Sequence, residues 1–191
     1  MNSKINVTTN EIQQLLHVGE GNHLNLGGTA KAPGWKILNI QPGDYVDYVG
    51  DLRDLSQFHD NYFDVVYASH VLEHLSFRHH VASSLQGIYR ILKDDGRLFI
   101  SVPDLSVLCR LFLNEGLTKR DRANVMAMIY GGQLDDNDYH YCGFTSEFML
   151  DYLSYTRFKR MFKVDEFNLF QDTSAMRYGG VLISLNIIAT K

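Results

Sequence analysis

The sequence predicts an α/β protein with a Rossmann-like, doubly wound sheet of seven strands, mostly parallel but with an antiparallel strand pair at the C-terminus. Short runs of β-branched and aromatic residues alternate with amphipathic helical patterns in the first part of the chain, which is typical of parallel βαβ units. Two apolar runs near the end have no helix between them, so we expect them to pair antiparallel. Glycines and polar side chains follow two early strands, where ligands bind in such sheets.

The length and composition favour a single domain. The chain has 191 residues, of which 45% are hydrophobic and 21% are charged, and this is enough for one sizeable core. We expect residues 1–22 to form a polar N-terminal extension and residues 23–191 to form the domain. The formal net charge of −4 lacks the basic excess of proteins that bind phosphate backbones, so no nucleic-acid partner is expected.

Cysteine usage and hydropathy indicate the compartment. Cys109 and Cys142 lie far apart and outside any C-x-x-C motif, which argues against a zinc ribbon or a disulfide framework. No apolar run is long enough to span a bilayer, and the first residues lack the apolar core of a signal peptide. We therefore expect a cytoplasmic protein with reduced thiols and no membrane partner, and these features are compatible with a homodimer.

The first strands are short and end in turns. Residues 23–26 form an apolar run that stops at Gly27 and Gly28, where a ligand can approach the backbone closely. A turn at 32–35 replaces the usual crossover helix, and residues 36–40 and 47–52 supply the second and third strands. The paired glycines are the first expected wall of a site.

The fourth strand leads into the most informative stretch of the sequence. Residues 63–68 are mostly β-branched or aromatic, as expected of a central strand that is covered on both faces, and we expect a helix directly after them. Ser69, His70, Glu73 and His74 would then stand at the carboxyl edge of the sheet. His74 would lie one helical turn after His70 on the same face.

The rest of the chain completes the alternation. Helices are expected at residues 79–92, 104–113, 119–130 and 146–157. Further strands are expected at residues 97–102, 162–170 and 181–190. Asp104 is the expected N-cap of its helix, and the acidic, aromatic loop at 131–143 is expected to cover the mouth of the site.

Several short motifs resemble those of a known family. They are Leu-Asn-Leu-Gly-Gly at 24–28, Gly-Asp-Leu-Arg-Asp-Leu at 50–55, Tyr-Ala-Ser-His-Val-Leu-Glu-His-Leu at 67–75 and Ile-Leu-Lys-Asp-Asp-Gly-Arg-Leu at 91–98. With the strand order, they resemble the class I S-adenosylmethionine-dependent methyltransferases. Within that class, the motifs most resemble those of the small, type 11-like methyltransferases that are often found among polysaccharide-biosynthesis proteins.

The resemblance implies S-adenosylmethionine as the cofactor, held at the turns that follow the first strands. The positions that match the family's cofactor contacts are Asn25, Gly27, Gly28, Asn39, Asp51, Leu52 and Ser69. Of these, the glycines and the serine would border the methionine half and Asn39 would face the ribose. Asp51, with the backbone of Leu52, would meet the adenine amino group.

Three residues depart from the family's pattern. Asn25 replaces an acid, Thr29 takes a glycine position, and Asn39 stands where an acid usually accepts both ribose hydroxyls; an amide offers only one acceptor oxygen. These departures motivate an alternative, a methyltransferase-like binding or scaffold module without catalysis. A nicotinamide-dependent oxidoreductase would share the early strand order, but it fits neither the single glycine pair nor the antiparallel ending.

Histidines are the expected catalytic bases. Methyl transfer to a sugar hydroxyl needs a proton acceptor, and histidine suits that task near neutral pH. His70 is the first candidate, followed by His74 and His140. Because His70, Glu73 and His74 have the spacing of an inverted zinc-protease motif, metal-assisted transfer is an alternative to the metal-free reaction that we expect.

Two tyrosines are the expected contacts of the acceptor. Tyr139 and Tyr141 flank His140 in the loop at 131–143, and their rings suit an apolar floor for a sugar; loop tyrosines also serve as anchors with hydrogen-bonded hydroxyls. The sequence and its resemblance together predict an enzyme that methylates a small-molecule or carbohydrate-linked acceptor, at oxygen.

Overall fold

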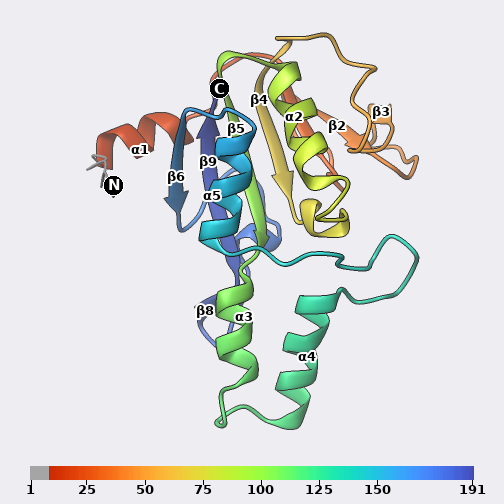
Figure 1. Cartoon of the computed structure of the whole chain (residues 1–191). Helices are drawn as coiled ribbons and strands as arrows, with labels where there is room; N and C mark the ends of the chain where they lie inside the picture. Colours follow the sequence, from red (N-terminus) through yellow and green to blue (C-terminus); the bar gives the residue numbers. More distant parts are fainter. Residues whose placement is uncertain (1–8) are drawn as a thin grey trace.

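The computed structural model describes residues 9–191 and contains one seven-stranded sheet (Figure 1). Its order is β3-β2-β1-β4-β5-β9-β6. The strands are β1 (His23–Leu26), β2 (Trp35–Asn39), β3 (Tyr48–Val49), β4 (Phe63–Ser69), β5 (Leu92–Pro103), β6 (Arg160–Val164) and β9 (Ser184–Thr190). Two further strands, β7 (Arg177–Tyr178) and β8 (Val181–Leu182), form a separate hairpin.

The predicted sheet topology is confirmed. β1 to β5 run parallel, and β9 is antiparallel to both β5 and β6. Three of the expected strands are shorter than predicted: residues 50–52, 165–170 and 181–183 lie outside the main sheet. Residues 1–8 of the expected N-terminal extension lie outside the described residues.

Helices follow the predicted positions closely from residue 79 onward. The helices are α1 (Thr9–Leu16), α2 (Val81–Ile91), α3 (Leu105–Phe112), α4 (Lys119–Tyr130) and α5 (Ser146–Tyr155), with 3-10 turns η1 (Leu72–His74) and η2 (Thr173–Ala175). Asp104 caps α3, because its side chain accepts a hydrogen bond from the backbone N–H of Val107. Between residues 9 and 191, no helix has the length and hydropathy needed to cross a bilayer.

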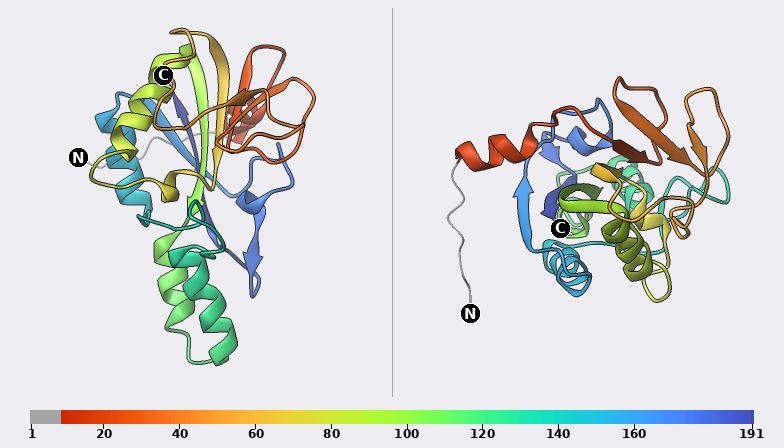
Figure 2. Two further views of the ribbon diagram at one scale, coloured as in Figure 1. Left: turned by 90° about the vertical axis from the view of Figure 1, so that its right-hand side faces the viewer. Right: turned by 90° about the horizontal axis from the view of Figure 1, so that it is seen from above.

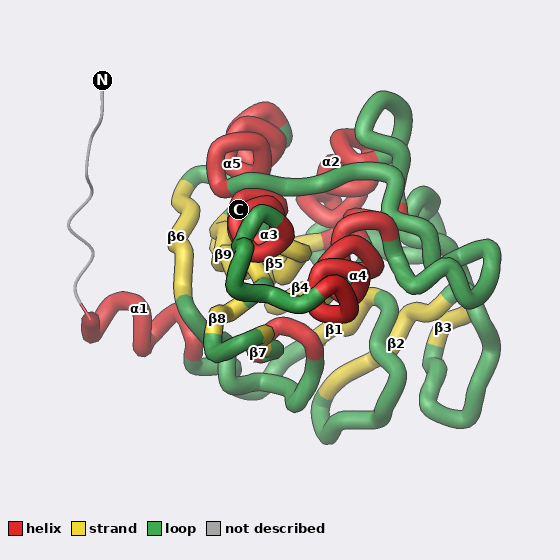
Figure 3. Tube along the Cα trace, turned by 90° about the horizontal axis from the view of Figure 1, so that it is seen from below, coloured by secondary structure: helices red, strands yellow, loops and turns green. Residues whose placement is uncertain are grey.

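Different elements cover the two faces of the sheet (Figures 2 and 3). α2 and α5 lie on one face and pack against it with apolar side chains such as Leu85 and Leu153. α1 and residues 165–176 lie on the other face, where the aromatic rings of Trp35 and Phe170 are 5.0 Å apart. Trp35 is therefore a partly buried residue that packs against the core of this second face.

The connections between β1, β2, β3 and β4 contain no helix. This confirms the expected loss of the first crossover helix. The prediction of a helix directly after β4 is wrong. His70 takes a left-handed backbone conformation, with φ of 52°, and the chain then makes only the single 3-10 turn η1. α3 and α4 pair with each other and project beyond the carboxyl edge of the sheet (Figure 1).

The turn after β1 lies directly against the turn after β4. Gly27 has a φ of +76°, and a methyl group built on it would overlap Cγ1 of Val71. The backbone N–H of Gly27 also donates a hydrogen bond to the carbonyl of Leu38, at 2.8 Å. Only glycine fits here, because the left-handed backbone and the close side chain both exclude a Cβ atom.

We predict that Gly27→Ala destabilises the fold more than Gly34→Ala. Gly34 has a matching φ of +78° but no atom within 4 Å of a built Cβ, so its substitution costs only the conformational strain, about 1–2 kcal/mol. Gly27→Ala adds overpacking, for a total of about 2–5 kcal/mol. Urea unfolding measures both. Equal unfolding midpoints would contradict the close contact, whereas Gly27→Ala/Val71→Ala should recover part of the loss.

Candidate functional site

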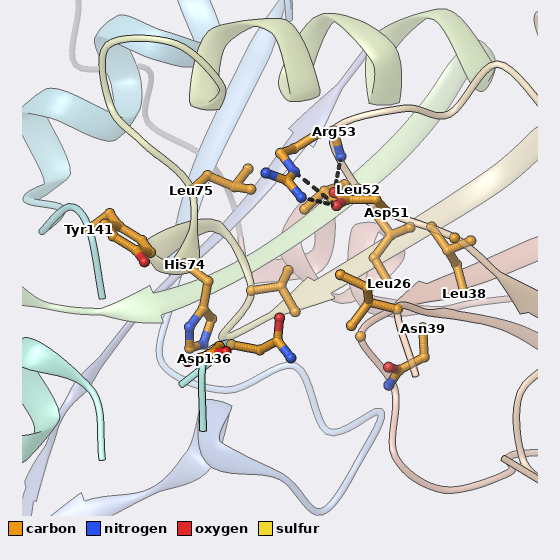
Figure 4. Close-up of a pocket in the computed structure, with 15 residues that line it drawn as sticks. Leu26, Leu38, Asn39, Asp51, Leu52, Arg53, His74, Leu75, Asp136 and Tyr141 are labelled. Carbon is orange, nitrogen blue, oxygen red and sulfur yellow. Dashed lines mark hydrogen bonds and ion pairs between the residues drawn. The ribbon is translucent and has the colours of Figure 1, made fainter. Parts of the chain in front are cut away.

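A cavity of about 290 Å³ opens at the carboxyl edge of the sheet, between the turns that follow β1, β2 and β4 (Figure 4). Six of the residues predicted for cofactor, catalysis or substrate line it: Gly27, Asn39, Asp51, Leu52, His74 and Tyr141. Figure 4 shows Asn39 and Asp51 toward one side of the cavity, and His74 and Tyr141 toward the other. Parallel strands place these turns at one edge, as the sequence predicts.

Asp51 is already engaged in an ion pair within the cavity wall. Its carboxylate accepts hydrogen bonds from the backbone N–H and from Nε of Arg53, each at 2.8 Å, and Nη2 of Arg53 forms a further short contact. The hydrogen bond from the guanidinium holds the pKa of Asp51 below its usual value. Arg53 also lines the cavity and was not predicted, although its position two residues after Asp51 suits such a turn.

Asn39 ties two of the turns together. Its Nδ2 donates a hydrogen bond to the carbonyl of Gly28 at 3.1 Å, and its Oδ1 accepts one from the backbone N–H of Gln41 at 2.9 Å. One acceptor position of Oδ1 is left for a ligand. The amide thus holds the rim of the cavity in place and also faces the space where a ribose is expected.

Asn25, Gly28 and Ser69 lie behind the cavity wall. Asn25 is 6% exposed, and a Cβ atom on Gly28 would lie 2.7 Å from its Nδ2. Among the described residues, no group forms a hydrogen bond with the buried Oγ of Ser69. None of these three residues lines the cavity, whereas Gly27 borders it.

Both ring nitrogens of His70 face protein groups. Nε2 lies 2.9 Å from Oγ of Ser184, and Nδ1 lies 3.2 Å from Oε1 of Glu73. The predicted common helical face of His70 and His74 is wrong, because the chain forms a 3-10 turn there and the two rings point to different neighbours.

The structure instead brings His74 against His140. Their rings are 4.8 Å apart and nearly perpendicular. The loop at 131–143 reaches the site because the backbone N–H of Tyr141 donates a hydrogen bond to the carbonyl of Glu73, at 2.8 Å. Burial lowers the pKa of His140, and the charge of Glu73 opposes that shift. His140 therefore belongs to the same cluster as Glu73 and His74.

Tyr141 separates the first cavity from a second one. The second cavity, of about 850 Å³, lies beside α5 and is lined by aromatic side chains that include Phe77, Phe148 and Tyr152. Tyr139 is 38% exposed, and its ring lies 6.5 Å from that of Tyr141. The residues from α5 were not predicted, because their helical spacing alone reads as ordinary core packing.

Comparisons with known proteins agree with this geometry. Residues 30–100 match the family model described as "Methyltransferase domain", and this segment contains Asn39, Asp51, His70 and His74. A comparison with curated proteins finds no match to this chain.

Solved methyltransferase structures share the fold. An S-adenosylmethionine-dependent methyltransferase from Mesorhizobium loti has a TM-score of 0.59 and 16% identity, over 94% of this chain and 95% of that chain. A Burkholderia thailandensis 1,6-didemethyltoxoflavin-N1-methyltransferase, solved with S-adenosylhomocysteine, has a TM-score of 0.55 and 16% identity, over 91% and 72%. A CurJ carbon methyltransferase has a TM-score of 0.56 and 15% identity, over 90% of this chain and 48% of that chain.

This chain therefore spans about half of the CurJ protein and nearly all of the Mesorhizobium loti protein. At these identities the solved structures show a common fold, and the family match places the methyltransferase signature in the segment that builds the cavity. Together they give this chain the fold of class I S-adenosylmethionine-dependent methyltransferases and a partial match to a methyltransferase family model, and both agree with S-adenosylmethionine as the cofactor.

Proposed function

We propose that this protein transfers a methyl group from S-adenosylmethionine to an oxygen atom of a small-molecule or carbohydrate-linked acceptor. The observation that supports this best is the cavity at the carboxyl edge of the sheet, with Asn39 and Asp51 toward one side and His74 and Tyr141 toward the other. The first pair suits a nucleoside, and the second suits an acceptor and its proton.

The residues of the cavity fit the cofactor. Gly27 leaves its backbone open, because no side chain can stand between it and Val71. The Asp51 carboxylate can accept a hydrogen bond from an adenine amino group, and the remaining acceptor position of Asn39 can take one from a ribose hydroxyl. Leu26 and Leu38 contribute apolar side chains to the wall of the cavity.

S-adenosylmethionine supplies a methyl group that is already activated on a positively charged sulfur. The protein must then align the acceptor and take its proton. We assign the role of proton acceptor to His74 in place of the first candidate, His70. Both ring nitrogens of His70 face protein groups, whereas His74 lines the cavity. His140 lies against His74 and stabilises its position.

We further propose that the acceptor occupies the aromatic cavity beside α5. Phe148, Tyr152 and Tyr141 present ring faces and edges, which suit the apolar faces of a sugar, and Asp151 adds a hydrogen-bond acceptor. These features support a carbohydrate acceptor, as in polysaccharide biosynthesis. The free thiols of Cys109 and Cys142 support a reducing compartment, the cytoplasm.

We predict that Asp51→Asn weakens binding of S-adenosylmethionine and S-adenosylhomocysteine by about tenfold or more, because a hydrogen bond to a charged group contributes about 1.5–3 kcal/mol. Isothermal titration measures both ligands. Asp54→Asn is the control, since Asp54 is exposed and lies outside the cavity. An unchanged affinity in Asp51→Asn would overturn the adenine contact. Absence of binding to the wild-type protein would favour the scaffold alternative.

We predict that His74→Ala lowers kcat about a hundredfold, the usual contribution of a general base, while its affinity for S-adenosylhomocysteine stays near that of the wild type. The assay follows S-adenosylhomocysteine release with a panel of hydroxylated sugars. His79→Ala is the control, because His79 is exposed outside the site. A larger loss in His70→Ala than in His74→Ala would return the role to His70.

A further inference from the structure

Glu73 is a buried carboxylate without the partners that such a group needs. Its side chain is 1% exposed, and within residues 9–191 no group forms a hydrogen bond with either oxygen. Nδ1 of His70 lies 3.2 Å from Oε1. Burying a carboxylate with so few partners is costly, so a further positively charged partner would stabilise it.

The hydrogen bonds of His74 and His140 show which ring nitrogen of each carries the proton. Nδ1 of His74 lies 3.1 Å from the carbonyl of Tyr139, and Nδ1 of His140 lies 3.1 Å from the carbonyl of Met128. A carbonyl only accepts hydrogen bonds, so each Nδ1 carries the proton and each Nε2 keeps its lone pair. Histidine ligands of metal ions are oriented in this way.

The three residues are close enough to share one ion. Glu73, His74 and His140 each offer one donor atom, and these atoms lie within 4.8 Å of one another. An ion at about 2.0–2.2 Å from each donor would draw them closer by side-chain adjustment. The hydrogen bond from Tyr141 N–H to the Glu73 carbonyl already fixes the loop against η1.

We propose that Glu73, His74 and His140 bind a divalent transition-metal ion of the zinc type. Two imidazoles and one carboxylate are a common set of zinc ligands and leave a further coordination position open. Magnesium and calcium prefer oxygen ligands. Because His74 lines the cofactor cavity, an ion held by these residues would lie beside that cavity and would polarise an acceptor oxygen there.

This site differs from the one that the sequence spacing suggests. His70 is not a ligand here, because its Nε2 is held by Ser184 and its Nδ1 stands beside Oε1 of Glu73. That contact leaves Oε2 for the ion. Binding of the ion does not depend on the proposed methyl transfer. A catalytic use of the ion does rest on that proposed function. His74 is the proposed base of the ion-free protein; with an ion bound, His74 would hold the ion, and the ion would activate the acceptor oxygen in its place.

The test is a calorimetric titration of tag-free, chelator-treated protein with zinc chloride. We expect one tight zinc ion per chain and no comparable binding of magnesium chloride. Glu73→Gln and His140→Asn should each weaken zinc binding at least a hundredfold, whereas His79→Ala should bind as the wild type does. Absence of zinc binding by the wild type, or full binding by Glu73→Gln, would overturn the proposal.

Thermal unfolding separates loss of the site from loss of the fold. Zinc should raise the Tm of the wild type but not that of Glu73→Gln. Without metal, Glu73→Gln should still unfold in one cooperative transition, because the amide keeps the size of this buried side chain; equal zinc stabilisation of the two proteins would refute the site. Zinc binding by a protein that does not bind S-adenosylmethionine would support the metal site and refute only the methyltransferase proposal.

Discussion

The close contact between Gly27 and Val71 is the constraint on which the rest of the structure depends. Parallel pairing of β1 with β4 brings the two strand ends to one edge, and the missing side chain of Gly27 lets the two turns meet. Gly27 and Val71, which meet at this point, both line the cavity, together with Asn39 and Asp51. A bulkier turn after β1 would displace η1, and with it Glu73 and His74.

The elements whose residues carry a strong local pattern could be predicted from the sequence. α4 begins and ends where its pattern does, and Asp104 caps α3 as a short polar side chain before an apolar helix should. The antiparallel ending followed from the absence of a helix between the last two strands. The 3-10 turn after β4 could not be predicted. His70 has a left-handed backbone conformation there, and its side chain contacts Ser184 and Glu73. The contact with Ser184 forms only in the folded protein.

In the site, too, some residues could be predicted from the local sequence and others could not. Asn39, Asp51 and Leu52 lie in the cavity because they directly follow strands, and strand ends are readable in a sequence. The meeting of His74 with His140 is different. It requires the loop at 131–143 to fold back onto η1, through hydrogen bonds such as the one between His74 and the carbonyl of Tyr139, 65 positions away. No local pattern encodes such a contact, and the aromatic side chains of α5 were likewise indistinguishable from core residues.

The covering of the second face of the sheet has a consequence for synthesis on the ribosome. Without crossover helices after β1, β2 and β3, this face is closed by α1 and by residues 165–176. The hydroxyl of Tyr67 finds its partner in Asp172, 105 positions later. A nascent chain would thus carry an open aromatic surface until residues 165–176 emerge, and exposed surfaces of this kind aggregate. Chaperone demand during translation should therefore be greatest before residues 165–176 leave the ribosome.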